Sequence, residues 1–381
     1  MKASVHDAVA GIDPAAWNAL AGDYPFLRHE FLLAAEESGA ASPDSGWTPR
    51  HITLEQDGAV VAAMPLYEKS HSWGEFVFDW AWAQAYERAG LRYYPKLVSA
   101  VPFTPAPSRR LLGASVDDTQ ASGALIDAAT ALATRSDCSS LHILFAEPAE
   151  LPQLQASGLK LRKDCQFHWH NRGYADFDKF LATFSSRKRK KVRADRRKVA
   201  DAGIAFRHLG GETIDEATWR RVHELISITF LRRGSLPYFD LDFFLRITAS
   251  MPGGIRVILA ELGSTIVATA VFFESGNTLY GRYWGCDGDY DALHFETCYY
   301  QGIEYCIESG KALFEPGTQG EHKISRGFVP VATWSAHWLN HPEFFSAIGN
   351  YLNQESRYVD SYIDAVDERS PYRNSPGRDT Q

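Results

Sequence analysis

The sequence has no apolar run of the roughly 18 residues that a membrane-spanning helix requires, so we expect no transmembrane segment. Its first residues, MKASVHDAVAGIDPAAW, lack the long apolar core that follows a basic start in a secretory signal, so we expect no such signal. Cysteine is scarce, with five residues in 381 and none in CxxC spacing. An odd number without that spacing predicts a reduced, cytoplasmic setting with no disulfide framework and no structural zinc site.

Several catalytic motifs are also missing. The chain contains no GxSxG, no GxxxxGK(S/T) and no GxGxxG, which argues against a serine hydrolase, a nucleotide-triphosphate enzyme and a dinucleotide enzyme. His294 and Glu296 resemble half of a metal site, but side chains two residues apart on a helix point about 200° apart. No HExxH or second clustered pair accompanies them, so we predict no metal ion and interpret them as helix-capping and packing residues.

What the sequence does contain is an internal repeat. Residues 50–80 and residues 256–284 both read as a strand, a tight turn at Gly58 or Gly263, a second strand, a polar loop and an aromatic third strand. A second set of matches keeps one offset of 169 residues without gaps. Those matches pair Leu144-Phe145 with Leu313-Phe314, Gly158 with Gly327, His168-Trp169 with His337-Trp338, and Asn171 with Asn340. Self-similarity at a domain-sized period predicts two similar domains.

Length and composition agree with two domains. The 381 residues fit two units of roughly 100–200 residues each, and contents of 45% hydrophobic and 13% aromatic residues are sufficient for two cores. We predict an α+β fold of mixed sheets with helices, in two tandem domains. The predicted boundaries are 1–172 for the N-terminal domain, 173–203 for a basic connecting helix, 204–372 for the C-terminal domain and 373–381 for a polar tail.

Periodicity and turn residues predict the order of the elements. In the first copy we expect a helix over 25–38, strands over 49–56, 59–68 and 73–80, a proline-rich connection over 88–113, a helix over 120–135, and strands over 141–145 and 160–171. In the second copy we expect helices over 215–232 and 240–250, strands over 255–262, 264–274 and 278–286, a helix over 294–309, strands over 311–317 and 329–339, and a helical tail from Pro342.

The connecting helix carries a concentrated positive charge. Apolar residues Phe177, Phe180, Leu181 and Phe184 start it at helical spacing. Residues 185–198 then hold five Arg, four Lys and one Asp, in a chain whose net charge is −8. A solvated charged face is the plain interpretation. Because like charges at i, i+4 repel, we instead favour a nearby anionic partner, with these candidate contacts: Arg187, Lys188 and Lys191.

Residues 314–328, FEPGTQGEHKISRGF, are the best candidate for chemistry. Three glycines and a proline keep the segment irregular, so we expect it at the end of a strand, at the rim of a concavity. Glu321 or His322 is suited to accept a proton from an amine, and Lys323 is suited to hold a carboxylate, phosphate or oxyanion. Further candidates for substrate contact are Gln319, Arg326, Tyr283, Trp284, His294 and Glu296. The alternative is a polar capping loop with surface ion pairs, and aromatic residues that pack the core.

These residues carry a resemblance to a known family. The segments 93–105, 185–204, 293–305 and 314–330 resemble the Fem-like branch of the GNAT acyltransferase superfamily, in particular the bacterial family of peptidoglycan biosynthesis and recognition. The resemblance extends over about residues 20–365. It implies two GNAT-like domains, which agrees with the internal repeat.

The resemblance also implies a reaction. GNAT enzymes transfer an acyl group from acyl-coenzyme A to an amine, using a splayed strand, an anion-binding loop before a helix, and a Glu as base. Residues 101–112 occupy the position of that loop, but prolines replace its glycines. The resemblance therefore leaves Thr104, Arg109 and Arg110 as candidate cofactor contacts. Fem-type relatives instead take an amino acid from aminoacyl-tRNA and add it to a cell-wall precursor, for which the basic helix is suited.

Three hypotheses follow, in order of preference. The first is an N-acyltransferase that uses acyl-coenzyme A as a co-substrate, without a tightly bound cofactor, and acts on a small or cell-wall-related amine. The second keeps the reaction but takes the acyl group from aminoacyl-tRNA. The third is a non-catalytic GNAT-like protein that binds a cell-wall or peptide ligand. No DNA partner is expected.

Overall fold

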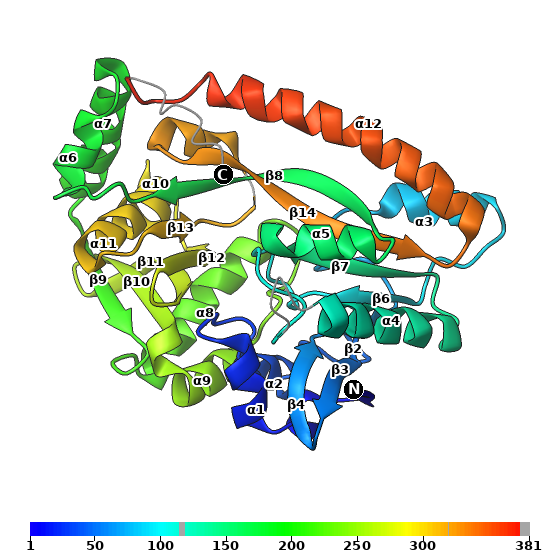
Figure 1. Ribbon diagram of the computed structural model, residues 1–381. Coiled ribbons are helices and arrows are strands. Elements are labelled where there is room, and N and C mark those ends of the chain that lie inside the picture. Colours follow the sequence, from blue (N-terminus) through cyan, green and yellow to red (C-terminus); the bar gives the residue numbers. More distant parts are fainter. Residues whose placement is uncertain (114–118, 319, 374–381) are drawn as a thin grey trace. The chain divides into compact units, whose positions relative to one another are not determined.

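A computed structural model describes residues 1–113, 119–318 and 320–373 (Figure 1). The chain divides into two compact units. Unit 1 comprises Met1–Asp164 and Ala332–Asp360, and unit 2 comprises Cys165–Val331 and Ser361–Gln381. Most of the polar tail predicted over 373–381 lies outside the described residues. None of the helices in the described ranges is long and apolar enough to cross a membrane.

Unit 1 contains two sheets. The smaller is antiparallel, with β1 (Lys2–His6), β3 (His51–Gln56) and β4 (Ala59–Met64) in the order β1-β3-β4. The larger has the order β2-β5-β6-β7-β14, from β2 (Trp47–Pro49), β5 (Tyr67–Lys69), β6 (Lys96–Ser99), β7 (Ser140–Ala146) and β14 (Val329–Leu339). Its helices are α1 (Pro14–Ala21), α2 (His29–Glu37), α3 (Trp80–Arg88), α4 (Thr119–Arg135), α5 (Leu151–Ala156) and most of α12 (Pro342–Asp367). β6 and β7 are parallel, a pairing that requires a crossover, here made by α4.

Unit 2 has one sheet, in which the strand order is β8-β13-β12-β11-β10-β9. Its strands are β8 (Lys160–His170), β9 (Ile204–Gly210), β10 (Ile255–Leu262), β11 (Thr265–Glu274), β12 (Thr278–Cys286) and β13 (Leu313–Glu315). β9 to β12 form an antiparallel meander, and β12 pairs with β13 in parallel. Its helices are α6 (Phe177–Ala182), α7 (Ser186–Asp201), α8 (Glu216–Leu231), α9 (Leu241–Ser250), α10 (Leu293–Phe295) and α11 (Gln301–Ser309), with a π-helical turn over Glu296–Tyr300 and a 3-10 helix, η5, over Glu321–Arg326.

The two units repeat one plan, as the sequence predicts. Each has antiparallel strands, a parallel pair joined through a helix, and a last antiparallel strand. The repeated residues occupy corresponding strands: Leu144 lies in β7 and Leu313 in β13, while His168 lies in β8 and His337 in β14. The last strands are exchanged, because β14 pairs with β7 in unit 1 and β8 pairs with β13 in unit 2. Each half of the sequence therefore supplies the last strand of the other unit.

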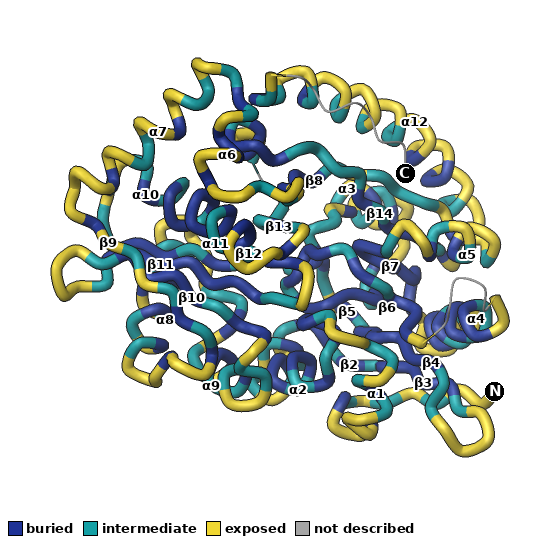
Figure 2. The backbone as a smooth tube through the Cα atoms, turned by 60° about the vertical axis from the view of Figure 1, so that its left-hand side comes forward, coloured by how far each residue is buried: buried dark blue, intermediate teal, exposed yellow. Residues whose placement is uncertain are grey.

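Each unit has its own core (Figure 2). In unit 1, the apolar face of α4, including Leu125, Ile126 and Ala129, packs against strand residues such as Leu141 and Ile143. In unit 2, α6 and α11 pack against the sheet through an aromatic cluster. The members of that cluster include Phe167, Trp169, Phe177, Phe180, Tyr299, Tyr300 and Phe314. The outer faces of α7 and α12 are exposed in Figure 2.

The strand predicted over 73–80 is wrong. These residues form a loop that leads into α3, with left-handed backbone at Gly74 (φ 82°) and Phe76 (φ 60°). The acidic side chains of Glu75 and Asp79 turn inward to the buried Lys96. In an extended strand, the side chains of residues 75 and 79 would point to the same face. The straight chain could not bend so that both reach one ammonium group.

The helix predicted over 173–203 is interrupted. α6 ends at Ala182 and α7 begins at Ser186, because Ser185 has an extended ψ of 148°. The backbone N–H of Ser185 donates to the carbonyl of Pro371 instead of continuing the helix. The connection predicted over 88–113 also contains β6, which the sequence did not reveal.

Candidate active site

The site in unit 2 is built around the place where two parallel strands separate. β12 and β13 pair only from Thr278 opposite Leu313 to Tyr280 opposite Glu315. β12 then continues to Cys286, whereas the chain after Glu315 turns away through Pro316 and Gly317. This is the splayed strand that the resemblance implied. Backbone groups of β12 beyond the fork can face a ligand instead of a neighbouring strand.

A β-bulge lies directly at this fork. Phe272 of β11 pairs with Gly281 and Val271 pairs with Tyr283, so Arg282 is the extra residue of β12. Bulges re-aim a side chain at the edge of a site. The Arg282 guanidinium donates to the Gly281 carbonyl at 2.8 Å and lies 5.5 Å from the centre of the Tyr280 ring. The bulge thus keeps a positive charge beside the fork.

Glu315 is the most perturbed carboxyl group at the fork. Its side chain is 6% exposed, and its Oε2 atom has no hydrogen-bond partner among the described residues. Burial raises the pKa of Glu315 from 4.5 to about 7, while the charge of Arg282 opposes this shift. A carboxyl group with a pKa near 7 and a free oxygen can accept or donate a proton at neutral pH.

Lys323 of η5 is also buried, and its pKa is also shifted toward neutrality. It is 1% exposed, and its Nζ donates to the Gly317 carbonyl at 2.5 Å. Burial and the charge of Arg282 lower the pKa of Lys323 to about 7. The same surroundings lower the pKa of His168 in β8 to about 3, so this imidazole is neutral. The fork therefore combines an acid and an amine that both titrate near neutrality, which is a common arrangement in catalytic sites.

The other predicted residues of this segment lie around that pair. Arg326 is buried, donates to the carbonyl of His322 at 2.6 Å and lies 3.4 Å from the Phe295 ring centre. The partly exposed His322 bonds through Nε2 to the Tyr299 hydroxyl at 2.9 Å. Glu321 is exposed and bonds to Tyr362 at 3.1 Å and to Arg369 at 2.5 Å. Gln319 lies outside the described residues.

Glu296 occupies the π-helical turn. It is 3% exposed, accepts from Gln301 at 2.8 Å and from Arg196 of α7 at 3.2 Å, and has a raised pKa caused by burial. Arg196 also pairs with Glu304 at 2.7 Å. Such turns often mark functional positions. Here the turn ties α7 to the helix beside the fork, and Arg326 approaches Asp195 of α7 at 3.7 Å.

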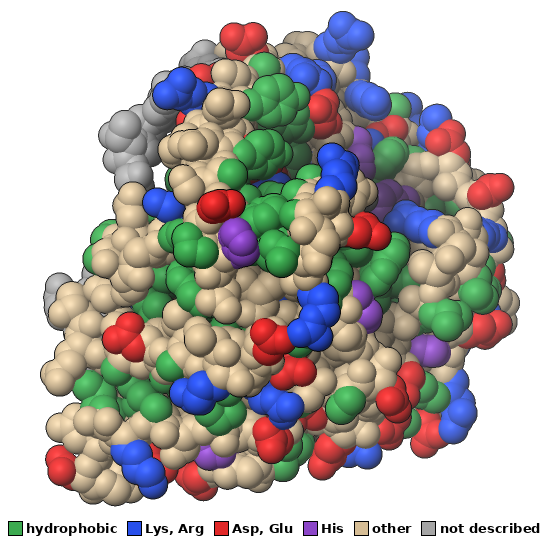
Figure 3. Space-filling view, turned by 90° about the vertical axis from the view of Figure 1, so that its right-hand side faces the viewer, with side chains coloured by type: hydrophobic (Ala, Val, Ile, Leu, Met, Phe, Trp, Pro, Cys, Tyr) green, Lys and Arg blue, Asp and Glu red, His purple; other side chains and the backbone are tan. Residues whose placement is uncertain are grey.

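α7 presents its remaining cations to solvent. Arg193, Arg196 and Lys198 form ion pairs with neighbouring carboxylates. Within the described ranges, five cationic side chains of this helix make no hydrogen bond or ion pair: Arg187, Lys188, Lys190, Lys191 and Arg197. On the face drawn in Figure 3, positive and negative side chains are interspersed. The unpaired charge of α7 lies near the 3-10 helix η5, since Asp195 of α7 approaches Arg326 at 3.7 Å.

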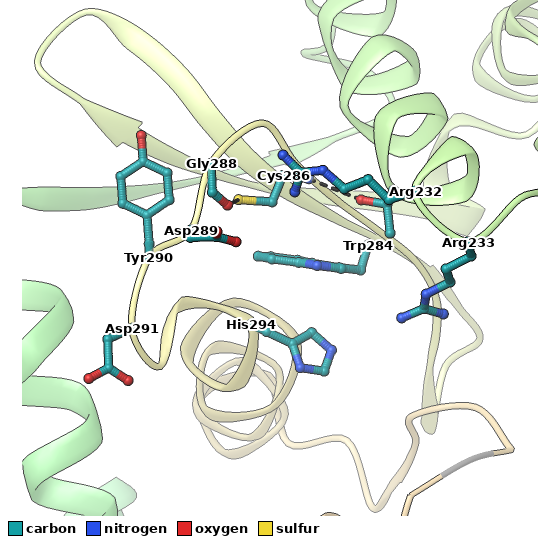
Figure 4. Close-up of a pocket in the computed structure, with 10 residues that line it drawn as sticks. Arg232, Arg233, Trp284, Cys286, Gly288, Asp289, Tyr290, Asp291 and His294 are labelled. Carbon is teal, nitrogen blue, oxygen red and sulfur yellow. Dashed lines mark hydrogen bonds between the residues drawn. The ribbon is translucent and has the colours of Figure 1, made fainter.

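A pocket of about 560 Å³ lies at the far end of β12 (Figure 4). It is lined by Thr229, Arg232, Arg233, Trp284, Cys286, Gly288, Asp289, Tyr290, Asp291 and His294. The ring of His294 lies 5.2 Å from Trp284 and 6.1 Å from His322, measured between ring centres. The pocket wall therefore adjoins the segment that carries Lys323. Tyr283, by contrast, points into a core cluster with Phe230, Phe239 and Phe244.

The candidate cofactor residues of unit 1 are mostly engaged within the protein. Arg110 is fully buried, and its guanidinium donates to the carbonyls of Leu144 at 2.8 Å and Ala106 at 3.1 Å. Thr104 donates to the Pro102 carbonyl at 3.0 Å. Arg109 remains 41% exposed and lies 3.5 Å from Glu147. Among the residues of the described ranges, no cluster of His, Cys, Asp or Glu is arranged to hold a metal ion.

The chain consists of two α+β units of one plan, each with a parallel pair that leads from strand to loop to helix. The chain belongs to the FemAB-like family, described as peptidoglycan biosynthesis/recognition, whose model matches residues 8–374. No curated protein sequence matches it.

Solved structures of the same fold span the chain. FemX aligns at 14% identity and a TM-score of 0.56, covering 92% of this chain and 100% of its own. The C-terminal domain of a protein described as a lysylphosphatidylglycerol synthetase, from Agrobacterium fabrum, aligns at 10% identity and 0.55, covering 90% and 96%. L-PGS from Bacillus licheniformis aligns at 12% identity and 0.52, covering 85% and 96%. At such identities the similarity establishes the fold.

Proposed function

We propose that this protein is an N-acyltransferase that moves an aminoacyl or acyl group from an activated ester or thioester to an amine of a peptidoglycan-related acceptor. The observation that carries the proposal is that two buried ionisable side chains, Glu315 at the end of β13 and Lys323 bonded to the Gly317 carbonyl, lie at the fork of β12 and β13. Glu315 and Lys323 both have a pKa of about 7, beside the charge of Arg282. Membership of the FemAB-like family, described as peptidoglycan biosynthesis/recognition, supports a peptidoglycan-related acceptor.

In the proposed reaction, the amine nitrogen attacks the carbonyl carbon of the donor and a new C–N bond forms. Glu315 accepts the proton that the amine loses. Lys323 and Arg282 stabilise the negative oxygen of the tetrahedral intermediate, and the C–O or C–S bond to the carrier then breaks as the carrier takes up the proton that Glu315 holds. General-base catalysis contributes roughly 10²–10⁴-fold, and removing one oxyanion donor costs about 10²–10³-fold.

We assign the base role to Glu315 in preference to Glu321 or His322. Glu321 is exposed and engaged with Arg369 and Tyr362. The pKa of His322 is lowered to about 4 by burial and by the charges of Arg326 and Lys323, so it is a weak base at neutral pH. Glu315 is buried, and its Oε2 atom has no hydrogen-bond partner among the described residues. Its pKa of about 7 is close to neutral pH, as a general base requires.

The surface of α7 supports aminoacyl-tRNA as the donor. Its five unpaired cations lie on a helix that contacts the fork segment through Asp195 and Arg326, and polyanions bind such surfaces by releasing counterions. Acyl-coenzyme A is the second candidate. Its support in unit 1 is the exposed Arg109, since the guanidinium of Arg110 is used inside the protein.

The test is a transfer assay in which the purified protein meets charged tRNA or acyl-coenzyme A, with a panel of amines and muropeptides, read by mass spectrometry. Glu315→Gln should lower the rate at least about 100-fold. Glu308→Gln, at an exposed position of α11, is the matched control and should leave the rate unchanged. Turnover that survives Glu315→Gln would refute the base assignment, and no turnover with either donor would favour a non-catalytic binding protein.

A further inference from the structure

The loop between β12 and α10 follows the splayed strand and precedes a helix, the position in which the resemblance implies an anion-binding loop, yet it carries carboxylates. Three aspartates stand in this six-residue connection, at positions 287, 289 and 291. Asp287 pairs with Arg221, and Asp291 pairs with Lys198 at 2.6 Å. Asp289 is exposed, lines the pocket and has no ion pair within the described ranges. A pyrophosphate here would approach a negative wall, which is unfavourable.

The opposite wall of the same pocket is positive. α8 ends at Leu231, and Arg232 and Arg233 follow directly. Arg232 donates to the backbone carbonyl of Asp287 at 2.8 Å and so fixes the loop. The Arg233 guanidinium makes no hydrogen bond or ion pair to a described residue, and its charge contributes to lowering the pKa of His294. Arg233 is therefore available for an anionic group of a ligand.

An aromatic surface lies between the two charged walls. In Figure 4 the indole of Trp284 lies between Asp289 on one side and Arg233 on the other, with the His294 ring beside it. Burial and nearby cations lower the pKa of His294 to about 4, so this ring is neutral at physiological pH. The centre of the pocket thus suits a short apolar segment, flanked by groups of opposite charge.

We infer that this pocket binds an amino-acid unit of the acceptor, with its carboxylate at Arg233, its ammonium at Asp289 and its aliphatic part on Trp284. A volume of about 560 Å³ is sufficient for one such unit. A phosphate group would meet Asp289, and a plain acyl chain would leave both charges without a partner. This inference rests on the proposed function, which supplies the acceptor, and the His294 wall of the pocket lies 6.1 Å from His322 between ring centres.

The inference is tested by equilibrium binding, without any donor, so that its outcome is separate from that of the transfer assay. The probes are 6-aminohexanoate, which carries both charges, with hexylamine and hexanoate, which carry one each, and inorganic pyrophosphate. Titration calorimetry, with the fluorescence of tryptophan as a second readout, should give an affinity for 6-aminohexanoate at least about tenfold above that of either singly charged analogue.

Variants separate the two ends of the ligand. Arg233→Gln should remove the preference for 6-aminohexanoate over hexylamine, and Asp289→Asn should remove its preference over hexanoate. Arg220→Gln, an exposed cation elsewhere on α8, is the control and should preserve both preferences; melting temperatures confirm that all three variants fold. The inference would be overturned if pyrophosphate bound more strongly than 6-aminohexanoate, or if 6-aminohexanoate bound no better than hexylamine and hexanoate. It would also be overturned if only the control, Arg220→Gln, lost binding.

Discussion

Glu315 lies directly opposite Tyr280, at the last paired position before β12 and β13 separate. The negative charge of Glu315 contributes to raising the pKa of the buried Tyr280 hydroxyl, as burial does. The two strands therefore place an ionisable carboxyl group at the base of the fork, next to an aromatic residue that excludes water. Several measurable consequences follow from this position.

Replacement of Glu315 by Gln should change the dependence of stability on pH. The pKa of Glu315 is raised from 4.5 to about 7 in the folded state. A group with a raised folded pKa contributes stability that is fully present below pH 4.5 and is lost as the pH rises through 7. Between pH 4.5 and pH 7, the free energy of unfolding of the wild type should therefore fall by up to roughly 3 kcal/mol. The free energy of unfolding of Glu315→Gln should not show this fall. Urea unfolding at pH 5 and pH 8 measures this difference; parallel curves for the two proteins would contradict it.

Lys323→Met should separate stability from activity. The pKa of Lys323 is lowered to about 7, so its contribution to stability is present above pH 10.5 and is lost as the pH falls through 7. Methionine has a similar length and no charge. The variant should be at least as stable as the wild type at pH 6 to 7, measured by urea unfolding, while transfer falls by about 100-fold or more. A variant that is less stable and fully active would show that Lys323 has only a structural role.

Neutralising the unpaired charge of α7 should lower the affinity for tRNA. It should also make this affinity less dependent on the salt concentration. The variant combines Arg187→Gln, Lys188→Gln, Lys190→Gln and Lys191→Gln, and removal of like-charge repulsion should preserve the helix. Each lost phosphate contact should lower the slope of log K against log salt by roughly one. The control removes the same charge from exposed or partly exposed positions elsewhere in unit 2, with Arg172→Gln, Lys179→Gln, Arg220→Gln and Arg246→Gln. Equal effects in both variants would refute a specific surface on α7.

The sequence predicted most of unit 2 because its signals are local. The strands over 255–262, 264–274 and 278–286 match β10, β11 and β12 to within one residue. Their apolar runs are bounded by glycine and polar turns, with Gly263 in a left-handed conformation at φ 62°. The exchange of β8 and β14 between the units could not be predicted, since a repeat in the sequence specifies equivalent strands but not their pairing partners.

The sequence singles out residues 314–328 as the candidate segment, but the roles that we propose for its residues depend on their burial. Residues 314–328 contain both Glu315 and Glu321, and spacing alone does not distinguish them. The structure buries the first at the end of β13 and leaves the second on the surface. Arg282 gave no signal, because a single arginine in a strand predicts nothing until the bulge in β12 is known. The pocket residues Arg233 and Asp289 likewise come together only when α8 lies near the end of β12.

The last prediction concerns a buried ionic network in unit 1. This network holds residues 73–80 as a loop, where the sequence predicted a strand. Lys96 has no solvent exposure, and its Nζ donates to Ser72 and Glu75 at 2.8 Å each and to Asp79. Asp79 also accepts from the Tyr93 hydroxyl at 2.6 Å. One ammonium group thus holds a loop that the aromatic pattern alone would extend as a strand.

Lys96→Met should destabilise unit 1 by roughly 3–5 kcal/mol, because it leaves buried carboxylates without their counter-charge. The control is Arg92→Met, which breaks a pair with Asp137 that is exposed on both sides and should cost at most about 1 kcal/mol. Chemical unfolding of both variants measures the difference. A cost for Lys96→Met no larger than for the control would mean that the network does not hold the loop.

A second comparison isolates the charge from the packing. Burial raises the pKa of Glu75 to about 7, whereas Lys96 is the main cause that lowers the pKa of Asp79 to about 2. Asp79 therefore stabilises the fold above pH 3.8 and loses this contribution as the pH falls through 2. Adding Asp79→Asn and Glu75→Gln to Lys96→Met removes both unpaired charges at once. The triple variant should regain a substantial part of the lost stability, since a neutral buried network of similar volume has no uncompensated ion. If the triple variant is no more stable than Lys96→Met, the loss of stability comes instead from the missing hydrogen bonds of Lys96.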